Sequence, residues 1–152
     1  MYLIVDIGNS RSKIVVSDRY SVVYDAVVES VDKDFIASIF SGYPAIDRAI
    51  VASTRGDAQV VCAMLQEYVS KVVCFDPKST PVPIANRYNT PHTLGADRLA
   101  AAVGAWAMYP DSDIMIVDFG TAITIDYVIG GAFVGGNISP GVTTRFRALA
   151  DY

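Results

Sequence analysis

Apolar and polar residues alternate over the start of the chain in the way that short β-strands require. Three runs rich in Val, Ile and Tyr lie at 2–7, 13–17 and 20–28. A short polar connection, Asp18-Arg19, separates the last two runs. Strands joined this closely must pair antiparallel, because a parallel pair needs a crossover of roughly a dozen residues. The pattern therefore predicts a three-stranded antiparallel meander.

A helical period then alternates with further strand-like runs. Helices are expected over 32–41 and 57–69, and strands over 48–53 and 71–75. The resulting order βββαβαβ predicts a mixed α/β domain in which helices cover a sheet. Residues 76–93 keep no period and predict a long irregular loop, and loops of that length in compact proteins usually serve a function or are disordered.

The same pattern restarts after the loop. A helix is expected from Leu94 to Met108, and the pentapeptide at 116–120 then repeats the one at 4–8 in four of five positions. Strand-like runs at 122–128 and 132–134 complete a second meander. A repeated motif at the end of the first strand of a repeated pattern predicts an internal duplication.

The second copy is expected to be incomplete in this chain. From Arg145 the sequence resembles the start of the first helix of that copy, and the later helices and strands are missing. The predicted domains are a first α/β domain with the long loop over 1–93, and a connecting helix with the start of the second copy over 94–152. We expect the natural protein to be longer.

Composition excludes several classes of function. Hydrophobic residues make up 52% of the chain and charged residues 18%, which suits a compact core and argues against disorder. The net charge is −4 and no Lys/Arg block stands out, so the electrostatic footprint of a nucleic-acid binder is missing. No apolar run approaches the ~20 residues that span a bilayer.

The N-terminus and the cysteines point to a cellular compartment. Asp6 interrupts the apolar start of the chain, which makes it a poor signal peptide. Cys62 and Cys74 lie in apolar surroundings and are expected to be buried, reduced thiols rather than a disulfide or metal pair. These features predict a soluble cytoplasmic protein with no nucleic-acid or membrane partner.

Each copy of the repeat ends its first strand with Asp-x-Gly. A glycine in this place lets backbone N–H groups approach a ligand closely. In the first copy Asn9, Ser10 and Ser12 add short donors, and Lys13 adds a mobile cation. Backbone amides, hydroxyls and an ammonium group together suit a polyphosphate.

The carboxylates of Asp6 and Asp118 would repel a phosphate unless a cation lay between. Mg²⁺ is therefore expected near both residues. On the alternative interpretation, each Asp-x-Gly is only a turn that closes a hairpin. The fingerprints G-x-x-x-x-G-K-[ST] and G-x-G-x-x-G are absent, which excludes the commoner phosphate sites.

The long loop leads into Asp97 and Arg98 on the first turn of the expected helix. The helix N-terminus favours the charged form of a carboxylate, so Asp97 should be able to accept a proton. Arg98 beside it can hold a substrate carboxylate at two points. Alternatively, Asp97 is merely a first-turn residue and Arg98 its solvated neighbour. His92 is expected to be structural.

Four motifs occur in order over almost the whole chain. They are Asp-Ile-Gly-Asn-Ser at 6–10, Tyr-x-x-Pro-x-x-Leu-Gly-x-Asp-Arg at 88–98, Asp-Phe-Gly-Thr-Ala-x-Thr-Ile-Asp at 118–126 and Gly-Gly-x-Ile-x-Pro-Gly at 135–141. In this combination they resemble the type III pantothenate kinases, a family that is similar to the Bvg accessory factors. The resemblance implies the actin-like, ribonuclease H-like fold of acetate and sugar kinases and heat-shock ATPases, with two duplicated βββαβαβ domains around a nucleotide cleft.

The resemblance also implies an activity and a set of roles. Members phosphorylate the terminal hydroxyl of pantothenate with ATP to give 4′-phosphopantothenate, the first step of coenzyme A biosynthesis. Asp97 would be the general base. The ATP-binding residues would be Asp6, Gly8, Asn9, Ser10, Lys13 and Thr121. The pantothenate-binding residues would be Tyr88, Gly95, Ala96, Asp97 and Arg98. Asp118, with Thr121 beside it, would lie by an activating monovalent cation, K⁺ or NH₄⁺, and Mg²⁺ would lie near Asp6.

Two departures from the family pattern are visible. Ser10 and Arg11 stand where many members have Thr and Asn, a change that keeps the hydroxyl. Members are dimers in which a threonine from the partner's later sequence completes the pantothenate site. That part is missing here, so the 152-residue chain alone is expected to be inactive.

Two other functions remain open at this point. One is a nucleotide-binding regulator of transcription, which would have no need for the pair Asp97-Arg98. The other is an actin- or chaperone-like ATPase, which would turn over ATP without pantothenate and would place a water-orienting residue at position 97.

Overall fold

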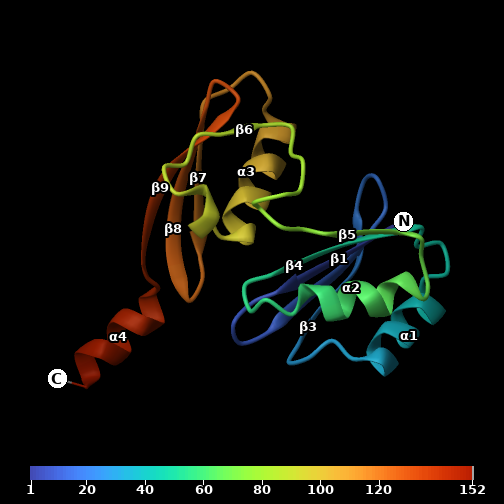
Figure 1. The fold of residues 1–152 in the computed structure, drawn as a ribbon. Coiled ribbons are helices and arrows are strands. Elements are labelled where there is room, and N and C mark those ends of the chain that lie inside the picture. Colours follow the sequence, from blue (N-terminus) through green and yellow to red (C-terminus); the bar gives the residue numbers. More distant parts are fainter. Residues whose placement is uncertain (152) are drawn as a thin grey trace. The chain divides into compact units, whose positions relative to one another are not determined.

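Figure 1 shows the computed structural model, which describes residues 1–151. The chain forms two compact units, Met1–Asp76 and a second unit from Pro77 onward, each built on its own sheet. The sequence placed this boundary at 93/94. The compact units divide at 76/77, and strand β6 (Ala85–Asn86), inside the expected irregular loop, pairs with a strand of the second sheet.

The first unit contains a five-stranded sheet with the order β3-β2-β1-β4-β5. Its strands are β1 (Tyr2–Ile7), β2 (Ser12–Ser17), β3 (Val22–Val28), β4 (Arg48–Ser53) and β5 (Lys71–Cys74). The first three strands pair antiparallel, so the expected meander is confirmed, and β4 and β5 extend the sheet in parallel. The carboxyl ends of β1 and β4 therefore lie side by side.

Two helices cover one face of this sheet and form the hydrophobic core with it. They are α1 (Lys33–Gly42) and α2 (Ala58–Gln66). Their buried apolar side chains pack with alternate residues of β1 and β2, because successive strand residues point to opposite faces. The largest fully buried side chains of this cluster are Leu3, Val5, Ile14, Val16, Val51 and Leu65. On the opposite face Ile4, Ile50 and Val73 remain exposed.

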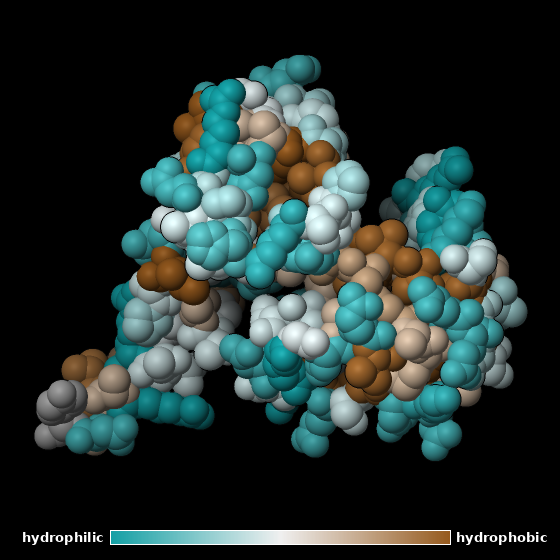
Figure 2. Space-filling view, in the orientation of Figure 1, coloured by the Kyte–Doolittle hydropathy of each residue, from teal (hydrophilic) through white to brown (hydrophobic). Residues whose placement is uncertain are grey.

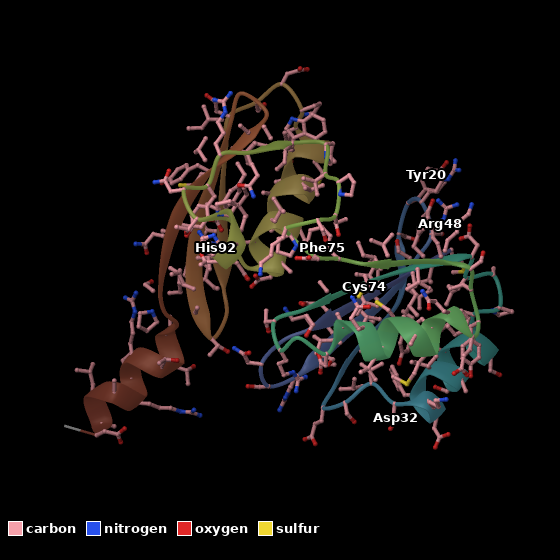
Figure 3. The ribbon with its side chains drawn as sticks, in the orientation of Figure 1. Tyr20, Asp32, Arg48, Cys74, Phe75 and His92 are labelled. Carbon is pink, nitrogen blue, oxygen red and sulfur yellow. The ribbon has the colours of Figure 1, made fainter. Side chains whose placement is uncertain are left out.

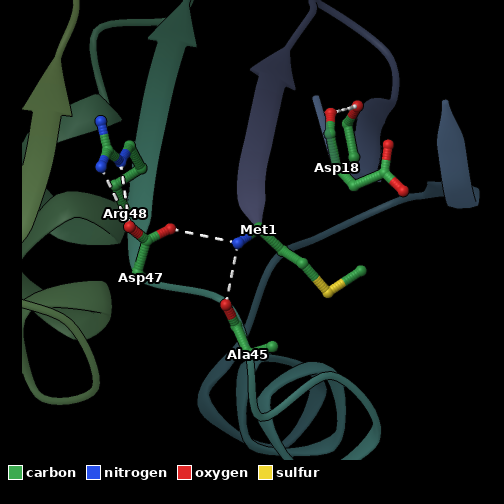
Figure 4. Close-up of polar contacts among 6 residues, drawn as sticks. Met1, Asp18, Ala45, Asp47 and Arg48 are labelled. Atoms are coloured by element: carbon green, nitrogen blue, oxygen red, sulfur yellow. Dashed lines mark hydrogen bonds and ion pairs between the residues drawn. The ribbon is translucent and has the colours of Figure 1, made fainter. Parts of the chain in front are cut away.

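Polar contacts fix the start of β1 (Figure 4). The Met1 ammonium donates to the Ala45 carbonyl oxygen at 2.9 Å and to Oδ1 of Asp47 at 3.1 Å. The Arg48 guanidinium donates to the other Asp47 oxygen at 3.0 Å. Hydrogen bonds from Arg48, and then from the N-terminus, hold the pKa of Asp47 below its usual value.

The second unit contains a four-stranded sheet with the order β6-β9-β8-β7. Its long strands are β7 (Ile114–Phe119), β8 (Ala122–Ile129) and β9 (Ala132–Pro140), which form the second antiparallel meander. Helix α3 (Ala96–Met108) packs against β7 and β8. Helix α4 (Val142–Ala150) follows β9 and buries none of its described side chains.

Some element limits differ from those expected. Helix α2 ends at Gln66 rather than 69, and α4 begins at Val142 rather than Arg145. The third strand of the second meander was expected to end at 134, but β9 continues to Pro140. The glycines after Val134 weaken a strand by propensity, yet their pairing with Tyr127 and Asp126 of β8 keeps them in the sheet. Gly135 has a φ of 115°, a conformation that favours glycine.

The two cysteines are free thiols. Cys62 is buried, as expected, whereas Cys74 at the end of β5 is half-buried (Figure 3). Burial, with a hydrogen bond to Cys74, raises the pKa of the Cys62 thiol to about 12. Within residues 1–151, none of the helices has the length and apolar character needed to cross a membrane.

Candidate active site

The turn between β1 and β2 carries the first group of predicted site residues. The Gly8 N–H donates to the Arg11 carbonyl oxygen at 3.1 Å and closes this turn, with Asn9 and Ser10 exposed at its tip. Asp6 and Lys13 are direct partners across the two strands, so both point to the same face of the sheet. The structure thus gathers a carboxylate, an ammonium group and short polar side chains around one hairpin.

Ser12 does not belong to this group. It pairs with Ile7 on the helix-covered face of the sheet and is 1% exposed. The expectation that Ser12 adds a donor for phosphate beside Asn9 and Ser10 is wrong, because strand alternation turns its hydroxyl inward.

Thr54 lies beside the same turn and was not predicted from the sequence. Its N–H donates to the Ile7 carbonyl oxygen at 3.0 Å, and its hydroxyl lies 3.4 Å from the amide oxygen of Asn9. The signal that could have found it is topological. Thr54 follows β4, which is parallel to β1, and parallel neighbours end at the same edge of a sheet.

The second group of predicted residues surrounds the start of α3. The loop approaches through β6 and a 3₁₀ turn at Pro91–Thr93, and Gly95 then caps the helix. Asp97 is exposed on the first helical turn, and its Oδ1 accepts the Arg98 backbone N–H at 2.9 Å. A Cβ on Gly95 would lie 2.4 Å from that oxygen, so the glycine makes room for the Asp97 carboxylate. Ala96 is buried.

Arg98 is not a solvated neighbour of Asp97. It is 9% exposed and forms an ion pair with Asp126 of β8, which is 2% exposed. The guanidinium Nε lies 3.1 and 3.0 Å from the two carboxylate oxygens, and Nη2 also donates to Oδ1. The hydrogen bond to Asp126 raises the pKa of Arg98, so the guanidinium stays charged.

Tyr88 and Gly136 complete the surroundings of this pair. The Arg98 guanidinium carbon lies 5.6 Å from the centre of the Tyr88 ring, and that ring packs edge-on against the buried Phe133 at 5.9 Å. Gly136 is the partner of Asp126 across β8 and β9. A Cβ at Gly136 would lie 1.9 Å from the Ile125 carbonyl oxygen and 2.6 Å from Oδ1 of Asp126, so only glycine fits.

The third group lies where β7 ends. Asp118 and Thr121 are exposed on either side of Gly120. Gly141 packs against this turn, since its N–H donates to the Thr121 carbonyl oxygen at 2.8 Å and a Cβ there would lie 2.2 Å from the Gly120 oxygen. The glycine motif at 135–141 therefore supports both the Asp126 position and the Asp118 turn.

The chemistry of these groups suits phosphate and cations. Among residues 1–151, no three His, Cys, Asp or Glu side chains gather into a group that would hold a metal by themselves. Mg²⁺ in kinase sites is held by one or two carboxylates together with substrate phosphates, and exposed carboxylates such as Asp118 fit that donor set. The expected positions of Mg²⁺ near Asp6 and of a monovalent cation near Asp118 stay predictions.

The structure brings the predicted residues together within each unit. In the first unit these are Asp6, Gly8, Asn9, Ser10 and Lys13, and in the second Tyr88, Gly95, Ala96, Asp97 and Arg98. His92 lies exposed in the 3₁₀ turn of that second group (Figure 3). The motifs alone gave no role to Asp126, although the motif at 118–126 ends on it.

Comparisons with known proteins agree with the motifs. A family model described as type III pantothenate kinase matches residues 2–152. A curated relative of that name from Bacteroides fragilis is 39% identical over 153 aligned residues, covering 100% of this chain and 62% of the relative. Another from Phocaeicola vulgatus is 39% identical, covering 98% and 61%. The chain thus spans about three fifths of the length of these relatives.

A solved structure extends the likeness to the fold. It is a candidate Baf family transcriptional activator from Campylobacter jejuni, at TM-score 0.59 and 21% identity, covering 98% of this chain and 59% of that one. With the order βββαβαβ and a second copy of its first three strands, this likeness confirms the expected duplicated, ribonuclease H-like fold.

Proposed function

The chain belongs to the type III pantothenate kinase family, and from that premise we propose that the protein transfers the γ-phosphoryl group of ATP to the terminal hydroxyl of pantothenate. The product would be 4′-phosphopantothenate, which opens coenzyme A biosynthesis. This activity is proposed for the whole protein, because the chain spans only part of its relatives. The observation that carries the proposal is the pairing of an exposed carboxylate, Asp97, with a fixed guanidinium, Arg98, on one helical turn.

Asp97 is the proposed general base. Phosphoryl transfer passes through a loose transition state, so positioning and charge neutralisation supply most of the catalysis. The Asp97 carboxylate would hold the pantothenate hydroxyl in line with the γ-phosphate and accept its proton late in the transfer. Its exposure and its place on the first turn of α3 support this role.

Arg98 is the proposed ligand of the pantothenate carboxylate. Its guanidinium carries five N–H donors, and the pair with Asp126 uses Nε and Nη2, which leaves Nη1 for another partner. The Tyr88 ring, Gly95 and Ala96 would form the rest of this substrate site.

The nucleotide phosphates would lie against the first hairpin. The Gly8 turn, Asn9, Ser10 and Lys13 would supply donors there, and Thr121 would bind ATP as the family resemblance implies. When bound, Mg²⁺ near Asp6 and K⁺ or NH₄⁺ near Asp118 would neutralise phosphate charge. A homodimer and a cytoplasmic site of action belong to the same proposal, and the free thiols of Cys62 and Cys74 support the second.

The regulatory alternative has weaker support. Its basis is the Campylobacter jejuni structure, and a likeness at 21% identity concerns the fold alone. A regulator that only binds nucleotide needs neither an exposed base nor a held guanidinium at the start of α3.

A coupled assay of the full-length protein with ATP and pantothenate, with and without K⁺, tests the proposal. We expect pantothenate-dependent ADP release, and we expect Asp97→Asn to lower kcat by about 10²-fold or more while ATP still binds, as is usual for a lost general base. Asp111→Asn, a change at an exposed carboxylate in the turn after α3, is the matched control. ADP release without pantothenate would favour an ATPase, and an active Asp97→Asn would leave Asp97 as a helix-start residue.

A further inference from the structure

Asp126 is a buried carboxylate, and removing its charge from water costs free energy. Its side chain is 3% exposed and that of Arg98 is 9% exposed, so both charges have left water. Desolvation of two such ions often cancels their attraction, and an apolar pair of similar volume is frequently as stable or more stable. Stability alone is therefore a poor reason for this pair.

Two groups hold the guanidinium, and a third supports one of them. Asp126 binds the edge formed by Nε and Nη2, the Tyr88 ring lies 5.6 Å from the guanidinium carbon, and Phe133 packs against that ring. Gly136 leaves the space that the Asp126 carboxylate occupies, because a Cβ at that position would lie 2.6 Å from Oδ1 of Asp126. A long arginine side chain, which otherwise loses rotamer freedom on binding, is thereby fixed in advance.

We propose that Asp126 is a positioning residue: it holds Arg98 by one edge so that the Nη1 side is presented to the carboxylate of an anionic substrate. The inference rests on the proposed function, which makes that substrate pantothenate. On this proposal the carboxylates of Asp126 and Asp97 have different roles. The charge of Asp126 is balanced by the guanidinium, whereas Asp97, one residue before Arg98 and exposed, stays available for the hydroxyl that reacts.

The test uses the full-length protein and three variants: Asp126→Asn, Arg98→Met and the double variant. Steady-state kinetics give kcat and KM for pantothenate and for ATP, normalised to the folded fraction. We expect Asp126→Asn to raise the KM for pantothenate about tenfold or more, with kcat and the KM for ATP changed less than threefold, because charge-assisted hydrogen bonds to the substrate are misaligned. Panthenol, which has an alcohol in place of the carboxylate, should lose its disadvantage against pantothenate in this variant.

The double variant separates positioning from folding. It removes both buried charges, so it should fold better than Arg98→Met, which leaves Asp126 buried without a partner. Its KM for pantothenate should nevertheless equal that of Arg98→Met, since Asp126 acts only through Arg98. Asp111→Asn should leave all values unchanged.

Each remaining outcome has a definite meaning. A lower folded fraction of Asp126→Asn with an unchanged KM for pantothenate would overturn the inference and leave a purely structural pair. An inactive wild type would instead overturn the proposed function. In that case the ¹⁵N signal of the Arg98 Nε–H still decides whether Asp126 fixes the guanidinium, since it should be sharp in the wild type and broadened or shifted in Asp126→Asn.

Discussion

Four polar side chains are buried in the described part of the chain: Ser12, Arg98, Thr124 and Asp126. Arg98 and Asp126 form hydrogen bonds and an ion pair with one another, which fixes the position of the buried guanidinium. Among residues 1–151, the Ser12 hydroxyl has no hydrogen-bond partner. A buried polar group without a hydrogen-bond partner lowers the stability of the fold by roughly 1–3 kcal/mol, whereas a buried group that is hydrogen-bonded contributes favourably.

Ser12→Ala should therefore be neutral or should raise the free energy of unfolding by up to about 1 kcal/mol. Ser17, at the other end of β2, is the matched control. Its hydroxyl lies 2.7 and 2.8 Å from the Asp18 and Ser21 carbonyl oxygens and shares its one proton between them, so Ser17→Ala should be destabilising. Urea unfolding of the full-length protein measures both, and equal losses would contradict the assignment of Ser12 as unsatisfied.

Cys62 predicts a pH dependence of stability. Burial raises the pKa of its thiol to about 12, against about 8.5 in an unfolded chain. Below about pH 8.5 both states keep the proton; above it the unfolded state ionises first, so the free energy of unfolding should fall as pH rises toward 12. Cys62→Ala should flatten this slope between about pH 8.5 and 10, and an unchanged slope would contradict the prediction.

At the scale of elements, α1 begins with a cap that its sequence specifies. The Asp32 carboxylate accepts the Phe35 N–H at 2.8 Å, and Asp34 adds a charge in the first turn (Figure 3). Helix α2 begins after Asp57, whose carboxylate instead accepts from the Ser53 hydroxyl at 2.6 Å and gives no side-chain cap. The start of α1 should therefore depend on its own side chain more than the start of α2 does.

Asp32→Ala should lower the free energy of unfolding by about 1 kcal/mol, the usual value of an N-cap. Ser41→Ala, at an exposed position near the end of the same helix, should change it by only a few tenths. Chemical denaturation with circular dichroism checks both. A loss for Asp32→Ala no larger than that for Ser41→Ala would mean that tertiary packing alone sets the start of α1.

At the scale of the whole molecule, the two copies of the repeat differ in what covers them. Leu3, Val5 and Ile7 of β1 are each 2% exposed. Their counterparts Met115, Val117 and Phe119 of β7 are 61%, 40% and 73% exposed. Figure 2 shows apolar side chains, coloured brown, on the surface of both units. Strand β7 is also an edge strand of its sheet, and exposed edges with apolar surface favour association.

The isolated 152-residue chain should therefore self-associate and should show no pantothenate kinase activity. Sedimentation velocity over a range of concentrations and the coupled assay on the same sample measure the two halves of this prediction. Replacing Phe119 by Ser should reduce the association, whereas Tyr20→Ser, a change at an even more exposed aromatic side chain of the first unit, should not. A monomer that phosphorylates pantothenate would contradict both halves.

Local pattern alone was enough for most of the fold. Strand alternation and helical period predicted the element order of the first unit, because burial of one face of an element imposes a period on the sequence. The repeated Asp-x-Gly predicted the second meander. The motifs likewise located Asp97 and Arg98 on the first turn of α3. The nucleotide cleft that the family resemblance implies stays a prediction.

Tertiary structure decided what depends on partners distant in sequence. The loop strand β6 joins the second sheet through pairing with β9, which no local period encodes. Ser12 turns inward because of its register with Ile7, and Thr54 reaches the first turn because β4 is parallel to β1. Arg98 finds Asp126, 28 residues away, only because α3 packs on β8. Residue types set the local periods, whereas strand register and helix packing set which side chains meet.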